Sequence, residues 1–206
     1  LVNNAIKYDA DISHCGYKVI ENNKETLFYD TKQIIIQDRK KGLVDLFEGT
    51  LIEPSLCNKI FKRSIVGSIR LDESIKINED LYFNVLLFNR SKKSIFEDKP
   101  KYYYMKRYNS ATTSDINSVR RMTDPLKVYE MIADLYKCDS EVFPYAKKMQ
   151  IGRNINIYNL LTLEKNIEFK KLKKEIRKYI KLNKFEIKNS KIITKKMKHM
   201  VYGILY

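Results

Sequence analysis

Two adjacent carboxylates, Glu79 and Asp80, open an apolar segment and are the residues of this chain best suited to chemistry. The segment that follows, 81–88, is apolar on nearly every side, which predicts a buried helix over residues 79–89. Carboxylates in the first turn lie at the positive end of the helix dipole, where the ionised form is favoured. An ionised carboxylate that faces out of a packed interior is suited to act as a general base.

The same carboxylates allow a second interpretation. Asn78 is a residue type that caps helices, and acidic residues are common in the first turn. Glu79 and Asp80 could then do no more than stabilise the start of the helix. The local residues alone leave both interpretations open.

The composition suits a folded protein in a reducing compartment. Its 206 residues are 44% hydrophobic, enough for one compact domain or one and a half. No run approaches the roughly 18 to 20 apolar residues that span a bilayer. The three cysteines and the two histidines are isolated, which argues against a disulfide framework and a zinc site. We therefore expect a cytoplasmic protein.

Positive charge is concentrated near the C-terminal end. Residues 165–198 hold fourteen basic residues against three glutamates, so +11 of the net charge of +15 lies there. Lys outnumbers Arg in this segment, which is less typical of specific recognition of bases or phosphates. An anionic membrane surface at the inner face of the cell membrane is one expected partner, and a solvated helical face without a partner is the alternative. Specific binding of nucleic acid is not expected.

The first part of the chain mixes helical and strand signals. Turn residues, Gly49 and the change between alternating and helical patterns delimit the elements. The pattern predicts the end of a helix over 1–8, strands over 10–20 and 26–29, a helix over 38–48, the helix over 79–89, a strand over 94–97, a break at Pro100, and a strand over 102–107.

The remainder of the chain is predicted to be helical. Apolar residues recur there at helical spacing in two places, namely at Leu126, Tyr129, Ile132 and Leu135, and at Phe169, Leu172, Ile176 and Ile180. We therefore expect an α/β fold class, with a mixed sheet and flanking helices over residues 1–122, followed by a basic helical C-terminal subdomain over residues 123–206.

Several segments together resemble the second, acceptor-side half of bacterial family 2 glycosyltransferases of the GT-A fold. Four segments match in order and spacing over about residues 8 to 114, although this chain has Cys57 where many relatives have Trp. They are Ala10-Asp11-Ile12 with Cys15-Gly16-Tyr17, Asn58-Lys59-Ile60-Phe61-Lys62-Arg63, Asn78-Glu79-Asp80-Leu81-Tyr82-Phe83, and Pro100 with Tyr102-Tyr103-Tyr104, Arg107, Asn109-Ser110 and Thr112.

The resemblance implies part of an inverting glycosyltransferase with a partial GT-A-like, Rossmann-like sheet. Such an enzyme moves a sugar from a nucleotide-sugar donor to a hydroxyl of a saccharide or lipid-linked acceptor, in the synthesis of cell-surface polysaccharide or glycolipid. Asp80 is implied as the catalytic base, with Glu79 beside it. The implied substrate-binding residues are Asn58, Lys62, Arg107, Asn109 and Ser110. A homo-oligomer is among the expected assemblies.

Donor binding is expected to lie outside this chain. Relatives hold the nucleotide and a divalent metal, Mg or Mn, on an N-terminal half with a D-x-D motif. Asp9-Ala10-Asp11 spells D-x-D, but it precedes a strand instead of following one, so we interpret it as a helix-to-strand junction. The chain also starts at Leu1 in a helix-like stretch, without a signal peptide. We expect a piece of a longer protein, with its metal ligands elsewhere.

Two further points stay open on the residues alone. Lys62 and Arg107 could stabilise the charge of a leaving nucleoside diphosphate, or could be solvated surface cations. Tyr102, Tyr103 and Tyr104 could stack on an acceptor, but alternation between core and rim is the preferred interpretation. Other functional classes that remain are a basic nucleic-acid-binding module and a non-catalytic interaction domain.

Overall fold

The computed structural model describes all residues except 28, 51, 107–118 and 163–166. It divides into two compact units, Leu1–Asn117 and Ser118–Tyr206. We expected the boundary near residue 122. The first unit is α/β and the second is helical.

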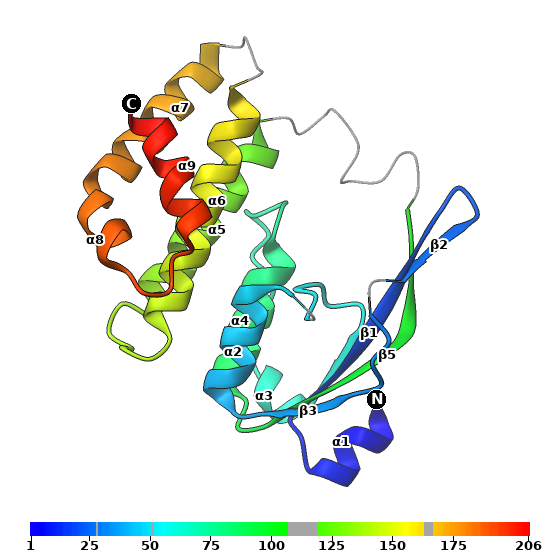
Figure 1. Ribbon diagram of the computed structural model, residues 1–206. Helices are drawn as coiled ribbons and strands as arrows, with labels where there is room; N and C mark the ends of the chain where they lie inside the picture. The colour runs from blue at the N-terminus through cyan, green and yellow to red at the C-terminus, as the bar shows by residue number, and fades with distance from the viewer. Residues whose placement is uncertain (28, 51, 107–118, 163–166) are drawn as a thin grey trace. The chain divides into compact units, whose positions relative to one another are not determined.

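The first unit is a mixed sheet with helices on both sides (Figure 1). The figure shows α2 and α4 on one side of the sheet and α1 on the other. In chain order the elements are α1 (Val2–Tyr8), β1 (Ile12–Glu21), β2 (Lys24–Leu27), β3 (Ile34–Gln37), α2 (Arg39–Glu48), β4 (Lys59–Phe61), α3 (Arg63–Val66), α4 (Glu79–Arg90) and β5 (Ser94–Met105).

Strand β1 is central to the sheet, whose order is β2-β1-β5-β3. One edge of β1 pairs in parallel with β5, and β5 pairs antiparallel with β3. The other edge of β1 is shared by two antiparallel strands, β4 beside residues 12–14 and β2 beside residues 18–21. The segment from β2 through β4 therefore returns to the edge of β1 where Cys15 and Tyr17 lie.

Strand β5 is one continuous element, so the predicted break at Pro100 was wrong. The chain instead shifts its register there: Glu97 pairs with Cys15, Pro100 with Gly16 and Tyr102 with Tyr17. Pro lacks a backbone N–H and is tolerated in a strand at such an irregularity, where a ladder hydrogen bond is not required. An irregularity of this kind changes which side chains point to a given face of the sheet.

Helix α4 was predicted correctly as a buried helix. Leu81, Val85, Leu87 and Phe88 are buried, and none of the residues 79–89 is exposed. Helix α2 was also predicted, with Asp38 as its N-cap and Gly49 as its left-handed C-cap.

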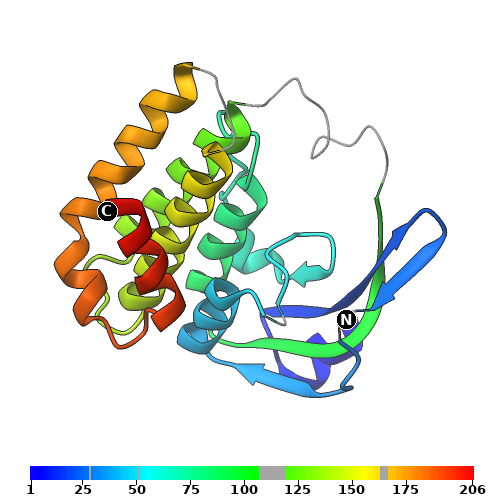
Figure 2. The same cartoon turned by 45° about the horizontal axis from the view of Figure 1, so that its top comes forward.

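Helices α2 and α4 pack closely against each other (Figure 2). A Cβ atom added at Gly42 of α2 would lie 2.8 Å from the Phe88 ring of α4, so only glycine permits this approach. Beneath them the His14 ring of β1 contacts the rings of Phe88 and Phe96, with centroids 5.6 and 5.0 Å apart. These contacts fix the orientation of α4 over the sheet.

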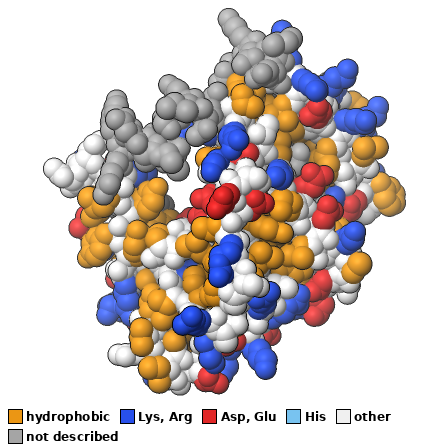
Figure 3. Space-filling model, turned by 180° about the vertical axis from the view of Figure 1, so that it is seen from behind, with side chains coloured by type: hydrophobic (Ala, Val, Ile, Leu, Met, Phe, Trp, Pro, Cys, Tyr) orange, Lys and Arg blue, Asp and Glu red, His pale blue; other side chains and the backbone are white. Residues whose placement is uncertain are grey.

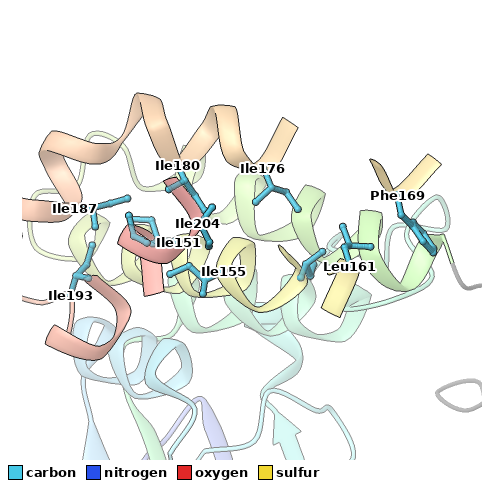
Figure 4. Packing of buried hydrophobic residues seen from close by; sticks show 11 residues of the cluster. Ile151, Ile155, Leu161, Phe169, Ile176, Ile180, Ile187, Ile193 and Ile204 are labelled. Atoms are coloured by element: carbon cyan, nitrogen blue, oxygen red, sulfur yellow. The ribbon is translucent and has the colours of Figure 1, made fainter. Parts of the chain in front are cut away.

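The second unit has helices packed around an aliphatic core (Figure 4). As predicted, Phe169, Ile176 and Ile180 are buried on one face of a helix, with Leu172 partly buried beside them. Over the described residues, none of the helices is long and apolar enough to cross a membrane. The elements are α5 (Arg120–Leu135), α6 (Phe143–Leu161), α7 (Ile167–Leu182), α8 (Lys184–Asn189) and α9 (Lys195–Leu205).

Candidate functional site

Asp80 lines a pocket of about 410 Å³ in the first unit. It projects from the first turn of α4, and the remaining walls come from β1, β5 and the segment 53–58 that precedes β4. The register shift in β5 gives Tyr102 and Tyr104 the same facing as Tyr17 and Val19 of β1. The pocket is lined by Tyr17, Val19, Glu53, Ser55, Cys57, Asn58, Asp80, Tyr102, Tyr104 and Lys106.

The environment of Asp80 makes its carboxylate more basic than that of a free aspartate. Burial raises its pKa, and the negative charge of Glu53 raises it further. A 2.7 Å hydrogen bond from the Leu81 N–H to Oδ1 and the charge of Lys59 act in the opposite direction. A higher pKa makes a carboxylate a better proton acceptor for as long as it stays ionised.

Asn78 does not act as the side-chain cap that the alternative interpretation requires. It occupies the N-cap position in a left-handed conformation, with φ of 68°, and its side chain makes no capping hydrogen bond. A non-glycine residue in this conformation is uncommon. Asn78 therefore does not cap α4 with its side chain, whereas Asp80 accepts the Leu81 N–H of the first turn and also lines the pocket.

A buried lysine, Lys59, supports the wall that the segment 53–58 forms. Its Nζ donates hydrogen bonds to the carbonyl oxygens of Glu53 and Ser55, at 2.5 and 2.7 Å, and to Oδ1 of Asn58 at 2.8 Å. Burial lowers the pKa of Lys59 to about 8, although nearby negative charges, Glu53 first among them, oppose the shift. Lys59 thus holds the segment 53–58 in place and puts a positive charge behind the pocket.

Glu53 is held on the pocket wall by β1, and its segment is held by α4. The Tyr17 hydroxyl donates a 3.0 Å hydrogen bond to Oε2 of Glu53. Burial, together with the charge and hydrogen bonding of Glu53, raises the pKa of Tyr17 to about 12, so this hydroxyl remains a donor. Asn84, one turn after Asp80, donates from its side-chain amide to the Pro54 carbonyl oxygen. The segment is therefore fixed before any ligand arrives.

Asn58, a predicted substrate-binding residue, lines the pocket but is 2% exposed. Its amide nitrogen donates a 2.5 Å hydrogen bond to the Cys15 carbonyl oxygen, and its amide oxygen accepts from Lys59. In return the Cys15 N–H donates to the Asn58 carbonyl oxygen at 3.1 Å. These contacts give Asn58 a structural task, which is to join β4 to β1 at the base of the pocket.

The other predicted residues are not gathered around Asp80. Glu79 is the half-buried first residue of α4 and does not line the pocket. Lys62 lies in a different pocket, where its Nζ is 3.9 Å from Asp9 and 3.7 Å from Asp11. Arg107, Asn109 and Ser110 lie outside the described residues.

The D-x-D sequence lies at a junction, as predicted. Asp9 is the left-handed C-cap of α1, with φ of 45°, and Asp11 directly precedes β1. Oδ2 of Asp11 accepts a 2.8 Å hydrogen bond from the Lys92 N–H, and its Oδ1 faces Lys62. A cation ligand set needs several oxygens without a competing ammonium group. Within the part of the chain that the structure describes, no group of three or more His, Cys, Asp or Glu residues could hold a metal.

Several residues of the site were not predicted, among them Tyr17, Glu53, Lys59 and Asn84. Lys59 is part of the Asn58–Arg63 segment, yet Lys62 was chosen from it. Burial distinguishes these two lysines, since Lys59 is 7% exposed while the Lys62 side chain is 55% exposed. The available sequence signal for Lys59 was its place in the Asn58–Arg63 segment.

A scan against protein-family models finds no match for this chain, and a search of curated proteins finds none either.

Proposed function

We propose that this chain is the acceptor-side half of an inverting glycosyltransferase of the family 2, GT-A type, with Asp80 as its general base. The observation that carries the proposal is the Asp80 carboxylate on the wall of a pocket that also holds Glu53 and aromatic side chains. The order of the four sequence segments supports the same class. In this proposal the donor nucleotide sugar and its divalent metal, Mg or Mn, bind on another half of the protein.

The proposed reaction is a single displacement at the anomeric carbon. An acceptor hydroxyl enters the pocket, and its oxygen forms a bond to the anomeric carbon while Asp80 takes its proton. The bond between that carbon and the leaving phosphate oxygen breaks, and the nucleoside diphosphate departs with the electron pair. A displacement of this kind inverts the configuration at the anomeric carbon.

Aromatic side chains of the pocket support acceptor binding. The rings of Tyr102 and Tyr104 line the pocket, and flat aromatic faces suit the apolar faces of a sugar.

Tyr103 points elsewhere, because its ring lies 5.5 Å from the ammonium of Lys18. The three tyrosines thus alternate as expected of a strand, but none of them is in the core: Tyr103 is 51% and Tyr104 37% exposed. The preferred interpretation of these residues as core and rim was wrong in that respect.

The electrostatics of the pocket are also suited to a base. Lys59 favours the ionised form of Asp80, while burial and Glu53 favour the protonated form. Together these influences leave the pKa of Asp80 raised, which makes its ionised carboxylate a stronger base. No role in catalysis is assigned to Lys62, which faces Asp9 and Asp11.

The proposal is tested with the longer protein that contains this chain together with a nucleotide-binding half. Nucleotide sugars of several types are supplied with a mixture of simple glycoside acceptors, and the products are followed by proton NMR. We expect release of nucleoside diphosphate and a product of inverted anomeric configuration. Retention of configuration, or no transfer from any donor, would contradict the proposal.

A further inference from the structure

A cationic pocket of about 490 Å³ lies in the second unit, between α7 and the end of α9. Five cations line it, together with Leu205 and Tyr206. No acidic side chain of the described residues is among the lining groups. The cations are Lys174, Arg177, Lys178, Lys181 and Lys184.

The acidic residues of the same segment lie elsewhere. Glu175 lines a separate pocket with Glu130 of α5 and Gln150 of α6. Glu186 acts electrostatically on Lys147 of α6 and on Tyr179 of α7, whose hydroxyl donates a hydrogen bond to Gln150 of α6. Among the described side chains, neither Glu175 nor Glu186 lines the cationic pocket. By contrast, charges of both signs are interspersed with hydrophobic side chains over the molecular face in Figure 3.

The aromatic end of α9 is attached to this cationic face. Lys184 donates a 2.5 Å hydrogen bond to the Tyr206 hydroxyl, and its ammonium lies 4.8 Å from the centre of that ring. Arg177 donates to the Leu205 carbonyl oxygen at 2.8 Å, and Tyr202 stacks on Tyr206 with centroids 5.4 Å apart. Tyr206 nevertheless remains 81% exposed.

Two large apolar side chains close to these cations in the sequence are exposed. Leu182 is 76% and Phe185 is 81% exposed, on either side of Lys184 in the sequence. Ile180 and Ile187, which are close to them in the sequence, are buried in the core of the unit. Leu182 and Phe185 are not part of that core. Exposed aliphatic and aromatic side chains next to a cluster of lysines are typical of surfaces that lie in a membrane interface.

We propose that this basic–aromatic surface, made of Lys174, Lys178, Lys181, Leu182, Phe185 and Tyr206, binds the surface of an anionic phospholipid bilayer. The lysines complement the lipid phosphates, and Leu182 and Phe185 enter the boundary between headgroups and acyl chains. Tyr206 has an apolar ring and a polar hydroxyl, which suits that boundary. The proposal does not depend on sugar transfer and can fail independently of it.

A bilayer is favoured over nucleic acid by two features. The single arginine of the cationic pocket, Arg177, already donates a hydrogen bond to the Leu205 carbonyl oxygen. Recognition of phosphates or bases commonly uses an arginine that donates two parallel hydrogen bonds, and no such arginine is evident in this pocket. The exposed Leu182 is aliphatic and offers no stacking face to a base, whereas stacking on aromatic rings is the usual means of binding single strands. An aliphatic group beside lysines fits lipid better.

The test is flotation of the whole chain with vesicles. Vesicles of phosphatidylcholine alone are compared with vesicles that also contain phosphatidylglycerol, at low and at high salt. We expect binding to the anionic vesicles that is at least about tenfold stronger than to neutral ones and is weakened by salt. Equal binding to both kinds of vesicle, or none to the anionic ones, would overturn the proposal.

Two variants locate the surface. The triple variant Lys174→Glu, Lys178→Glu, Lys181→Glu should lose at least about tenfold in binding. Its control, Lys24→Glu, Lys99→Glu, Lys137→Glu, changes the net charge equally at exposed positions elsewhere and should bind as the parent does. An equal loss in both variants would mean that total charge, and not this surface, is responsible.

The apolar part is tested with Leu182→Ser, Phe185→Ser against the control Val2→Ser, Ile6→Ser, whose side chains are 60% and 75% exposed. We expect the first pair to weaken binding that persists at high salt, and the control pair to leave it unchanged. Circular dichroism checks that each variant is folded. If a single-stranded RNA binds the chain tightly while anionic vesicles do not, the partner is nucleic acid and the membrane proposal is wrong.

Discussion

The Tyr17 hydroxyl donates a 3.0 Å hydrogen bond to Oε2 of Glu53, and this bond joins β1 to a segment 36 residues further along the chain. Lys59 holds the backbone of the same segment, and Asn84 holds Pro54 from α4. Three elements therefore fix one wall of the pocket that Asp80 lines. Because this wall is already ordered, a ligand that binds there loses no binding free energy to the ordering of the protein.

Tyr17→Phe tests whether the bond to Glu53 fixes that wall. The variant keeps the ring and removes only the hydroxyl, so the loss in the free energy of unfolding should be about 1 kcal/mol, as for one hydrogen bond. Urea unfolding of the whole chain measures it. Tyr103→Phe is the matched control, since Tyr103 does not line the pocket and is 51% exposed. Equal stability of the parent and Tyr17→Phe would show that the bond is unimportant.

Lys59→Met tests the buried ammonium. The variant preserves the apolar stem but leaves two backbone carbonyls and the Asn58 amide oxygen without their donor. We expect the free energy of unfolding to fall by about 2 to 4 kcal/mol. Lys62→Met is the control, and should change stability by less than about 0.5 kcal/mol because its side chain is 55% exposed. A similar effect of both substitutions would contradict the role given to Lys59.

His14 should make the fold sensitive to acid. Burial is the main reason that its pKa is lowered to about 3 from 6.5, and the charge of Lys59 contributes. Between these two pH values the unfolded chain binds a proton that the folded chain does not. Stability is therefore lost as the pH falls from 6.5 towards 3, by up to about 1.4 kcal/mol per pH unit from this residue.

His14→Gln removes this titration but keeps a polar side chain. Urea unfolding at a series of pH values should give a shallower decrease in stability below pH 6.5 for the variant than for the parent. The slopes are compared, so a uniform loss of stability in the variant does not affect the conclusion. Parallel slopes would mean that His14 is protonated in the folded state.

Elements with strong local signals were predictable from the sequence. The helix over 79–89 follows from a continuous apolar run, and α2 follows from the apolar positions between residues 43 and 47 and the glycine at its end. Strand β3, by contrast, was not predicted. Its residues 34–36 are all isoleucine, which gives no alternation, and it is defined by pairing with β5 some sixty residues later in the chain.

Two of the predicted site residues, Asp80 at a helix start and Asn58 before β4, line the pocket. Asp80 was found because a carboxylate at the start of an apolar helix is conspicuous. Glu53 and Tyr17 could not be found in this way, because their proximity depends on how the strands pair. Tyr102 and Tyr104 face the pocket because the register shifts near Pro100, and a proline in the sequence indicates a break but not the direction of the side chains that follow.

The pH dependence of sugar transfer should report the environment of Asp80. Its pKa is raised above the ordinary value of 3.8, chiefly by burial. Below that raised pKa the carboxyl is protonated and cannot accept a proton, so kcat/KM should fall as the pH is lowered through it. The acid limb should therefore lie above the pH expected for an exposed aspartate. An acid limb at or below pH 3.8 would contradict this environment.

The most direct test of Asp80 as the base is the turnover of Asp80→Asn in the longer protein that carries both halves. Asparagine preserves the size of the side chain but cannot accept the proton, so turnover should fall by about a hundredfold to ten-thousandfold with the fold intact. Asp134→Asn, at an exposed position in α5, is the control and should retain the parent rate. A folded Asp80→Asn variant that transfers sugar at nearly the parent rate would contradict the account.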